Sequence, residues 1–537
     1  MQQYLVSLLI FIPLTAALIT LFIPSYFEKS FRWVSVTAGL VQLLVLVQLI
    51  LSWEPSVSLQ FVEQKPWMTL DLGSWGTLKA EYFVGIDGLN FIFICLTVCV
   101  MLIAVVSSWR IAKNVKGYFA LLLILNAAIV GTFTSLDFLL FYLFFEFMLL
   151  PMFFLIGMWG GPRREYASIK FFLYTLLGSI LILIVMIGLY LSVQEPGQQE
   201  SVVHTFNLLH MTHPENFIQD SIFDPGSPWM IGAMNAREWG FLLLFIGFAI
   251  KLPMVPLHTW LPDAHVEAPT PVSVVLAALL LKIGGYGLLR IAFPVFPEAA
   301  LSFAWLVGLL GVISIIYGAL NAMASKDLKR LIAYSSVSHM GFVLLGLASL
   351  TTEGVTGSIY QMFSHGIISA LLFLIAGVLS DRTHDRMIDN YSGLATKMPA
   401  YFTIVLIGFF ASMGLPGFSG FIAEIMVFLG AFKSNSVNGL IHESFAIVST
   451  SGLILGAGYY LWTIQRMFFG SFHVKGEAKP EQLTPLTTQE FIVLVPLCMA
   501  AFLFGIFPQW VLNSVNPFTE QFVDVILDTG KRLTSNL

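Results

Sequence analysis

The chain has 537 residues, of which 57% are hydrophobic and 11% are charged, and its formal net charge is −5. A soluble domain carries about 25% charged residues, so this composition excludes a soluble globular protein and indicates a protein that is solvated by lipid. Nucleic-acid binding is also excluded, because no basic stripe runs along the sequence to neutralise phosphates.

Apolar runs of 18 or more residues recur along the chain, each long enough to cross about 30 Å of hydrocarbon as a helix. We therefore predict an all-α polytopic membrane protein with about fourteen spans, numbered in chain order. Their centres lie near residues 13, 42, 97, 126, 147, 181, 248, 281, 310, 341, 369, 413, 457 and 499. The first run lacks a basic leader and a small-residue cleavage site, so it is interpreted as a span and not as a signal peptide.

The basic residues of the loops predict how the chain is oriented in the membrane. If the chain starts outside, the loops after odd-numbered spans hold most of the 26 Lys and Arg residues, as at Lys29, Arg110 and Lys326. Loops rich in Lys and Arg face the cytoplasm, so both termini are expected on the opposite side. The two longest external loops, at about residues 53–84 and 194–238, are expected to fold as small caps.

Four charged residues lie inside apolar spans. They are Glu146 in span 5 (FYLFFEFMLLPMF), Lys251 in span 7 (GFAIKLPMVPLHTW), Lys282 in span 8 (VLAALLLKIGGYG) and Glu424 in span 12 (GLPGFSGFIAEIMVFL). Unpaired, they would together cost about 10 kcal/mol. Any one alone could form an ion pair that only joins helices, or could reach the interface. Two acids and two bases in four spans instead favour an ion path.

Lysine suits a proton path because burial lowers a lysine pKa towards neutrality and a nearby carboxylate raises it again. A contact between Glu146 and Lys251 would therefore act as a protonation switch. His339 (YSSVSHMGF) and His365 (QMFSHGIIS) fall in spans 10 and 11, and histidine titrates near working pH. Each is interpreted either as an intermediate proton carrier or as a hydrogen-bonded packing residue.

Spans 7 and 12 are predicted to be interrupted. In span 7, Pro253 and Pro256 follow Lys251, and each proline removes a backbone donor and clashes with the carbonyl four residues earlier. Span 12 carries the sequence GLPG at 414–417, which also favours unwound backbone. Unwound backbone at that depth is tolerated only where it lines a protein cavity or water.

The two interruptions lie about five spans apart, which suggests two related five-helix units, spans 4–8 and spans 9–13. Five is an odd number, so the second unit would enter the membrane from the opposite side as an inverted repeat. The charges do not superpose on a simple proline alignment, because Lys251 precedes its prolines and Glu424 follows Pro416. The predicted domains are residues 1–115 (spans 1–3), 116–295 (first repeat), 296–470 (second repeat) and 471–537 (span 14 and the C-terminal tail).

The chain resembles the proton-conducting antiporter family in two signatures. Residues 251–290 read KLPMVPLHTWLPDAHVEAPTPVSVVLAALLLKIGGYGLLR, and residues 327–342 read DLKRLIAYSSVSHMGF. The family comprises the large membrane subunits of respiratory complex I and the Mrp-type sodium/proton antiporters. The span count agrees with the family over essentially the whole chain, so the resemblance implies a proton-translocating membrane subunit.

The resemblance also implies a set of relay residues, position by position. They are the span 5 glutamate, the span 7 and span 8 lysines, the span 10 and span 11 histidines and the span 12 acid, here Glu146, Lys251, Lys282, His339, His365 and Glu424. In the pattern of the family, protons enter near the first half-channel, pass Lys251, Lys282 and His339, and leave past Glu424 to the outside.

Two features resemble the M-type subunits of complex I, the NADH:quinone oxidoreductase. The L-type and N-type subunits usually carry lysine where this chain has Glu424, and the chain ends soon after span 14 without the lateral helix of the L type. The resemblance implies L-type and N-type neighbours and a bacterial plasma membrane, a mitochondrial inner membrane being less expected. NADH, FMN, iron–sulfur clusters and quinone would be bound by partner subunits, because the sequence has no G-x-G-x-x-G turn after a strand and no clustered cysteines.

Alternative functions are also considered. A subunit of an Mrp-type multisubunit antiporter or of a membrane-bound hydrogenase would use the same residues. The WLPDAH stretch, with His258 and His265, forms either a proton entrance or a surface loop. An embedded acyl or glycosyl transferase would need an acid–histidine pair at the interface, and only Asp263 with His265 offers one. A passive channel or a scaffold has no reason to bury two lysines.

Overall fold

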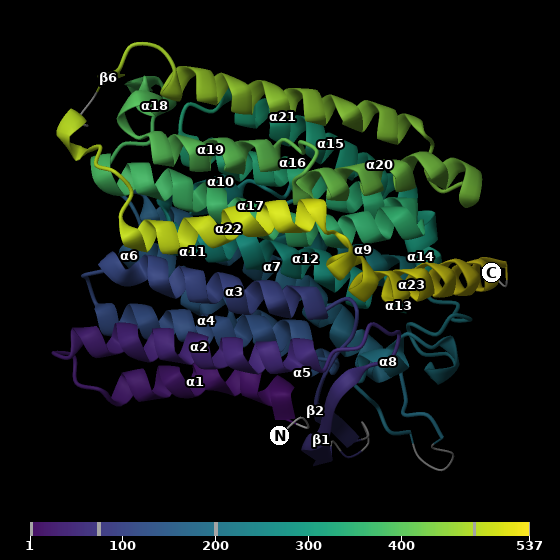
Figure 1. Cartoon of the computed structure of the whole chain (residues 1–537). Coiled ribbons are helices and arrows are strands. Elements are labelled where there is room, and N and C mark those ends of the chain that lie inside the picture. Colours follow the sequence, from purple (N-terminus) through teal and green to yellow (C-terminus); the bar gives the residue numbers. More distant parts are fainter. Residues whose placement is uncertain (1–3, 72, 74–76, 198–201, 476–478, 536–537) are drawn as a thin grey trace.

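The computed structural model describes residues 4–71, 73, 77–197, 202–475 and 479–535, and the chain forms a bundle of long helices (Figure 1). Thirteen helices in this described part are long and apolar enough to cross a membrane. Span 7 is not among them, because it consists of two shorter helices, α9 (Ala236–Lys251) and α10 (Trp260–Glu267). Counted as one interrupted span, these two helices bring the bundle into agreement with the predicted number of spans.

The other helices follow the predicted order. The spans before span 7 are α1 (Leu5–Phe22), α2 (Glu28–Leu51), α3 (Phe91–Ser107), α4 (Val115–Thr134), α5 with α6 (Phe138–Phe147, Leu149–Trp159) and α7 (Arg164–Ser192). Span 8 consists of α11 (Thr270–Val275), α12 (Leu281–Gly287) and α13 (Phe293–Val295), joined by π-helical segments Leu276–Leu280 and Leu288–Ala292. The later spans are α15 (Ala304–Ala324), α16 (Leu328–Ser349), α17 (Thr352–Thr383), α19 with α20 (Pro399–Ser412, Ser419–Val437), α21 (Ser444–Phe468) and α22 (Thr488–Ile506).

Both predicted interruptions are confirmed. The helix of span 7 ends at Lys251 and resumes at Trp260, across the stretch that contains the two prolines. The helix of span 12 ends at Ser412 and resumes at Ser419, across the GLPG sequence. Prolines and glycines that stop a helix in a soluble protein therefore stop it at the same positions inside this bundle.

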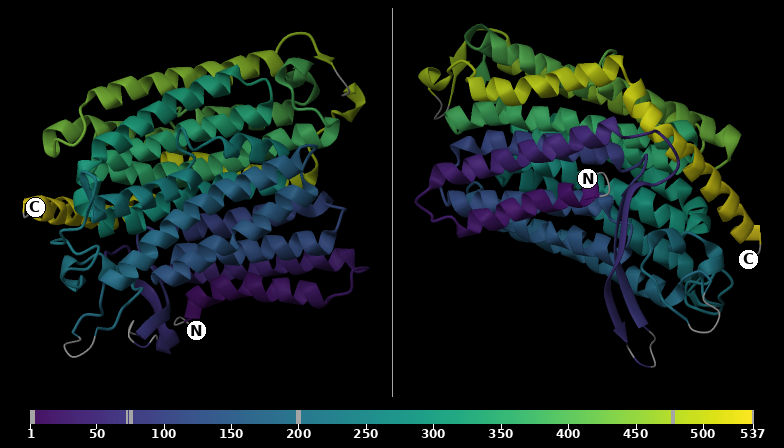
Figure 2. Two further views of the ribbon diagram at one scale, coloured as in Figure 1. Left: turned by 180° about the vertical axis from the view of Figure 1, so that it is seen from behind. Right: turned by 60° about the horizontal axis from the view of Figure 1, so that its bottom comes forward.

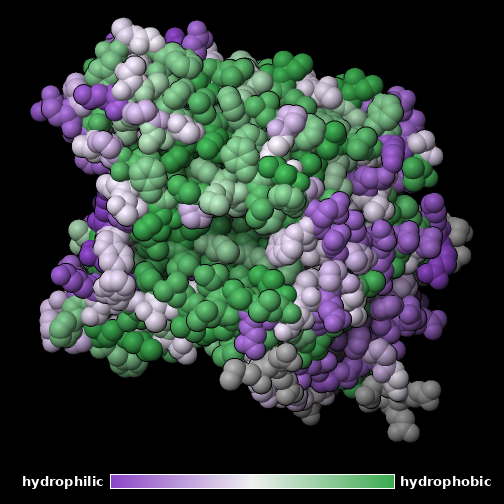
Figure 3. Space-filling model, in the orientation of Figure 1, coloured by the Kyte–Doolittle hydropathy of each residue, from purple (hydrophilic) through white to green (hydrophobic). Residues whose placement is uncertain are grey.

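Burial separates central helices from peripheral ones. The membrane windows of span 8 and of α17 are 100% buried within the chain, whereas those of α1, α2 and α7 are less than half buried. The central helices carry Lys282, His339 and His365, so the polar residues lie where lipid does not reach. On the surface, a broad hydrophobic band separates the polar ends of the molecule (Figure 3).

The helix α17 extends through the centre of the bundle and is held at both ends. It has 32 residues. Near its N-terminal end, the hydroxyl of Thr356 lies 2.9 Å from that of Thr519 on α23 (Gln509–Ser535). At its C-terminal end, Arg382 forms an ion pair with Glu490 on α22 at 2.7 Å. These contacts fix the axial position of α17.

A β-hairpin forms in the first of the two long loops that were expected to fold as caps, and it is an addition to the predicted all-helical fold. Strands β1 (Gln60–Asp71) and β2 (Thr77–Ile86) pair antiparallel and project beyond the helices (Figure 2). Lys79 on β2 forms an ion pair with Glu195 at 2.5 Å, which ties the hairpin to the loop that follows α7. The hydrogen bond with Glu195 raises the pKa of Lys79 above its ordinary value of 10.5.

The short elements complete the ends of the bundle, and the C-terminal tail folds as the amphipathic helix α23. At Gly88, before span 3, a Cβ atom would lie 2.4 Å from the carbonyl oxygen of Ser514, so α23 packs directly on this turn. The remaining short elements are α8 (Leu208–Met211), α14 (Pro297–Ser302), α18 (Leu394–Lys397), β3 (Met230–Ile231), β4 (Met234–Asn235), β5 (Tyr391–Ser392) and β6 (His473–Val474).

Candidate functional site

The interruption of span 7 leaves backbone groups unpaired, and neighbouring side chains bind them. The indole nitrogen of Trp260 donates to the carbonyl of Ile250 at 2.8 Å. The backbone nitrogen of Val255 donates to the hydroxyl of Ser314 on α15 at 3.1 Å. Lys251, the last residue of α9, is thus presented from a broken helix whose polar backbone is satisfied within the protein.

Lys251 contacts the aromatic ring of Phe145 and not a carboxylate. Its Nζ lies 3.1 Å from the centroid of that ring and 3.3 Å from the carbonyl oxygen of Phe145. Within the described residues, no ion pair joins Glu146 to Lys251, and Oε1 of Glu146 is buried without a hydrogen-bond partner. The expected direct contact between these two residues is therefore absent in this conformation.

Lys282 lies at the centre of the bundle and is fully buried. Its Nζ donates to the carbonyl of Ala277 at 2.6 Å and lies 2.7 Å from Nδ1 of His365. The residue sits between the two π-helical segments of span 8, and such segments are frequently found at functional sites. No feature of the sequence predicts these segments.

A second group of polar side chains continues from His365. The rings of His365 and His339 have centroids 5.4 Å apart, and Nδ1 of His339 lies 3.6 Å from Oε1 of Glu424. A cavity of about 10 Å³ lies among these three residues, close to the space that a single water needs. Gln361 also lies 3.2 Å from Nδ1 of His339.

The other ring nitrogen of His339 begins a hydroxyl chain that the sequence does not reveal. His339 Nε2 lies 3.2 Å from the hydroxyl of Ser412, where α19 ends. Ser412 lies 2.6 Å from the hydroxyl of Tyr460 on α21, which donates to Ser335 on α16 at 3.1 Å. Serine and tyrosine in apolar spans are common, so only the tertiary structure identifies this chain.

The structure therefore brings together four of the predicted residues, Lys282, His365, His339 and Glu424. The other two, Glu146 and Lys251, form a separate group. The two groups meet where span 8 passes the end of α9. A Cβ atom at Gly284 would lie 2.6 Å from the backbone nitrogen of Leu252, the residue after Lys251. Lys251 and Lys282 are consequently carried by backbones in direct contact.

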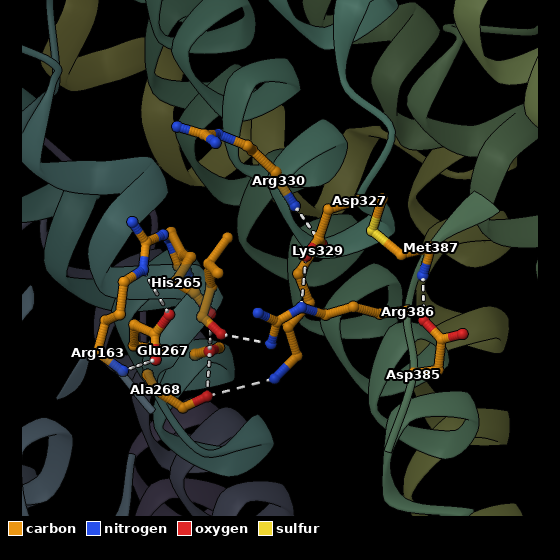
Figure 4. Close-up of polar contacts among 12 residues, drawn as sticks. Arg163, His265, Glu267, Ala268, Asp327, Lys329, Arg330, Asp385, Arg386 and Met387 are labelled. Atoms are coloured by element: carbon orange, nitrogen blue, oxygen red, sulfur yellow. Dashed lines mark hydrogen bonds and ion pairs between the residues drawn. The ribbon is translucent and has the colours of Figure 1, made fainter. Parts of the chain in front are cut away.

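Basic residues hold the end of span 7 that is formed by α10, as Figure 4 shows. Arg386 donates to the carbonyl of Val266 at 2.7 Å and forms an ion pair with Asp327 at 2.5 Å. Lys329 donates to the carbonyl of Ala268 at 3.2 Å. Cations that bind the last carbonyls of a helix stabilise it, so α10 is fixed although the helix before it is broken.

His258 and His265 near this end of span 7 are both buried, so they do not lie on a surface loop. His265 is fully buried, and neither of its ring nitrogens has a hydrogen-bond partner among the described residues. Its ring stacks on Phe373 at a centroid distance of 4.3 Å. Asp263 forms an ion pair with Lys170 at 2.7 Å. An acid–histidine pair of Asp263 with His265, which a transferase would need, is not formed.

Comparison with known proteins identifies the family. A profile described as "NADH:quinone oxidoreductase/Mrp antiporter, TM" matches residues 135–450. The chain belongs to this family. It is 40% identical over 529 residues to the NADH-quinone oxidoreductase subunit M of Rhodobacter capsulatus, covering 97% of each chain. The expected resemblance to the M-type subunits is therefore confirmed.

Solved structures of the family agree with the fold. A chain of respiratory complex I from Thermus thermophilus superposes with a TM-score of 0.79 at 28% identity, over 98% of this chain and 100% of that chain. A chain of the Mrp complex from Dietzia superposes with a TM-score of 0.76 at 19% identity, over 98% and 99% of the two chains. At 19% identity, the likeness to the Mrp chain concerns the fold alone.

Among the described residues, no cluster of His, Cys, Asp and Glu is placed to hold a metal ion.

Proposed function

We propose that this chain is a proton-translocating, antiporter-like membrane subunit of an NADH:quinone oxidoreductase. The observation that carries the proposal is the buried array of Lys282, His365, His339 and Glu424 in the centre of the bundle. Four ionisable groups within a chain of short distances can receive a proton on one side and release it on the other. A structural ion pair would need only two groups of opposite charge.

The proton moves along this array in the following order. The Lys282 ammonium donates to Nδ1 of His365, so it can pass a proton to that nitrogen. The cavity of about 10 Å³ has room for one water, which would connect His365 with His339. His339 then delivers the proton to Glu424 across 3.6 Å. Glu424 faces the unwound GLPG stretch, since a Cβ atom at Gly414 would lie 2.1 Å from its Oε2, and the proton leaves through this break.

Glu146 and Lys251 form the input of the path. A carboxylate near a lysine favours its protonated form, and Oε1 of Glu146, which has no hydrogen-bond partner among the described residues, is available to accept the ammonium. Movement of the ammonium between the two positions changes the field at Lys282, whose backbone is packed against the end of α9. Electron transfer in partner subunits would drive this movement electrostatically.

The proposal includes the surroundings of the chain. The neighbours are L-type and N-type antiporter-like subunits, and NADH, FMN, iron–sulfur clusters and quinone are bound by partner subunits. Large apolar side chains exposed on α20 and α21, such as Leu429, Ile447 and Ile454, support contacts with such neighbours or with lipid. The basic loops support an orientation with both termini on the periplasmic side, and the bacterial relative supports a plasma membrane. Residues 116–295 and 296–470 are proposed as the two inverted repeats.

The test is NADH-driven proton uptake into inverted membrane vesicles that contain the assembled complex. Lys251→Ala and Glu424→Gln each remove one ionisable group, and Lys113→Ala removes a lysine exposed on a cytoplasmic loop as the matched control. The two intramembrane variants should lose most proton uptake and the control should retain it. Undiminished NADH oxidation and uptake, with loss of sodium-dependent proton exchange, would instead identify an independent antiporter.

A further inference from the structure

The side chain that holds the Lys251 ammonium in this structure belongs to a residue that cannot be ionised. The ammonium lies over the face of the Phe145 ring, 3.1 Å from its centroid. Both residues are buried, with exposed fractions of 5% for Lys251 and 0% for Phe145. A ring face attracts a cation through its quadrupole, and this attraction is strongest where water is excluded, as it is here.

Other aromatic rings fix the orientation of this ring. Phe141 stacks on Phe145 at a centroid distance of 5.7 Å. Phe248 contacts it edge-on at 6.0 Å and 88° from the helix that ends at Lys251. The ring therefore cannot turn to follow the ammonium, and the flexible four-carbon stem of lysine is the part that moves.

The residue next to Phe145 offers a second binding position for the same ammonium. Glu146 follows it on α5, and Oε1 of Glu146 is buried without a partner. Two acceptors of different kind, a ring face and a carboxylate, thus stand on consecutive residues beside one mobile cation. The carboxylate is the stronger acceptor, so without the ring the ammonium would remain on it.

We propose that Phe145 is a positioning residue that holds the protonated Lys251 side chain apart from Glu146 by a cation–π contact. The inference rests on the proposed function, because it assigns the ring a role in proton transfer through Lys251. The ring lets the lysine leave the carboxylate while still protonated, and the ammonium then exchanges between the two acceptors. Loss of the ring face would keep Lys251 paired with Glu146 and slow each transfer.

The test replaces Phe145 by phenylalanines that carry one, two or three ring fluorines, in the assembled complex. Fluorine withdraws charge from the ring face and hardly changes its size, so packing is preserved while the cation–π contact weakens stepwise. The initial rate of NADH-driven proton uptake should fall with each fluorine, by about tenfold for the trifluorinated ring. The same series at Phe468, a buried ring that stacks on Phe402 at a centroid distance of 5.2 Å, should leave the rate unchanged.

Two conventional variants complete the design. Phe145→Tyr retains a ring face and should retain uptake, whereas Phe145→Leu should lose it. Equal rates along the fluorinated series at residue 145, or an equal fall along the series at residue 468, would overturn the role of the ring. Lys251→Ala in the same vesicles separates the two hypotheses. If that variant pumps fully, the proposed function fails, and if it does not pump while the fluorinated series is flat, only the inference about Phe145 fails.

Discussion

Span 8 passes the interruption of span 7 so closely that Gly284 has no room for a methyl group. A Cβ atom there would lie 2.6 Å from the backbone nitrogen of Leu252 and 2.6 Å from the carbonyl oxygen of Phe248. Backbone atoms cannot rotate away, so Gly284→Ala must displace α12 from the end of α9. We predict that this substitution separates Lys282 from Lys251 and impairs proton uptake without removing any ionisable group.

The neighbouring Gly285 supplies a matched control. The comparison with it gives the size of the destabilisation expected for Gly284→Ala. A Cβ atom at Gly285 would meet the sulfur of Met362, the far part of a flexible side chain that can move. Alanine gains about 1 kcal/mol of helix propensity over glycine at either position, so this gain cancels between the two variants. The remaining difference is the overpacking at Gly284, which costs about 1–3 kcal/mol.

The assay has two measurements on the assembled complex. The temperature at which this subunit dissociates on heating should be lower for Gly284→Ala than for Gly285→Ala. NADH-driven proton uptake should fall for the first variant and stay near the wild-type value for the second. If the two variants behave alike in both measurements, the close contact of the two backbones does not control the position of the lysines.

Two further predictions concern the hydroxyl chain and the external cap. Ser412→Ala removes the hydroxyl that His339 and Tyr460 share, which leaves buried groups unpaired at a cost of about 1–3 kcal/mol, and proton uptake should fall about tenfold. The pKa of Lys79 is raised by Glu195, so their pair should hold the hairpin fully below pH 10.5 and be lost as the pH rises through that raised pKa. The distance between spin labels on the hairpin and on the second external loop should therefore increase only above pH 10.5.

Each of these two predictions has its own control. Ser449→Ala removes a buried hydroxyl without a hydrogen-bond partner, so it should leave proton uptake unchanged. A fall equal to that of Ser412→Ala would show that loss of any buried hydroxyl impairs the subunit. Lys79→Met removes the ion pair at every pH, so the spin-label distance should already be long at pH 8. An unchanged distance in that variant would mean that other contacts dock the hairpin.

Features with a local cause could be predicted from the sequence. The apolar runs predict the spans because length and hydropathy alone decide whether a helix crosses lipid. Pro253 and Pro256 predict the break in span 7, and GLPG predicts the break in span 12, because closely spaced prolines and glycines remove helix hydrogen bonds and favour unwound backbone. The grouping of Lys282 with His365 agrees with the expectation that intramembrane charges face the interior.

Features that depend on tertiary packing could not be predicted. The contact of Lys251 with Phe145 instead of Glu146 depends on which way two consecutive side chains point from α5. The π-helical segments beside Lys282 arise from packing in a fully buried span and leave no sequence signal. The length of the loop at about residues 53–84 predicted a cap. It did not predict that this cap contains a β-hairpin.

The length and anchoring of α17 have a mechanical consequence. Its 32 residues rise about 48 Å, which exceeds the hydrocarbon thickness of about 30 Å, so the helix reaches both aqueous surfaces. One end is attached to α23 through Thr356 and the other to α22 through Arg382. A helix is stiff along its axis, so a pull on either surface displaces His365 by nearly the same distance. His365 therefore moves together with both ends of α17.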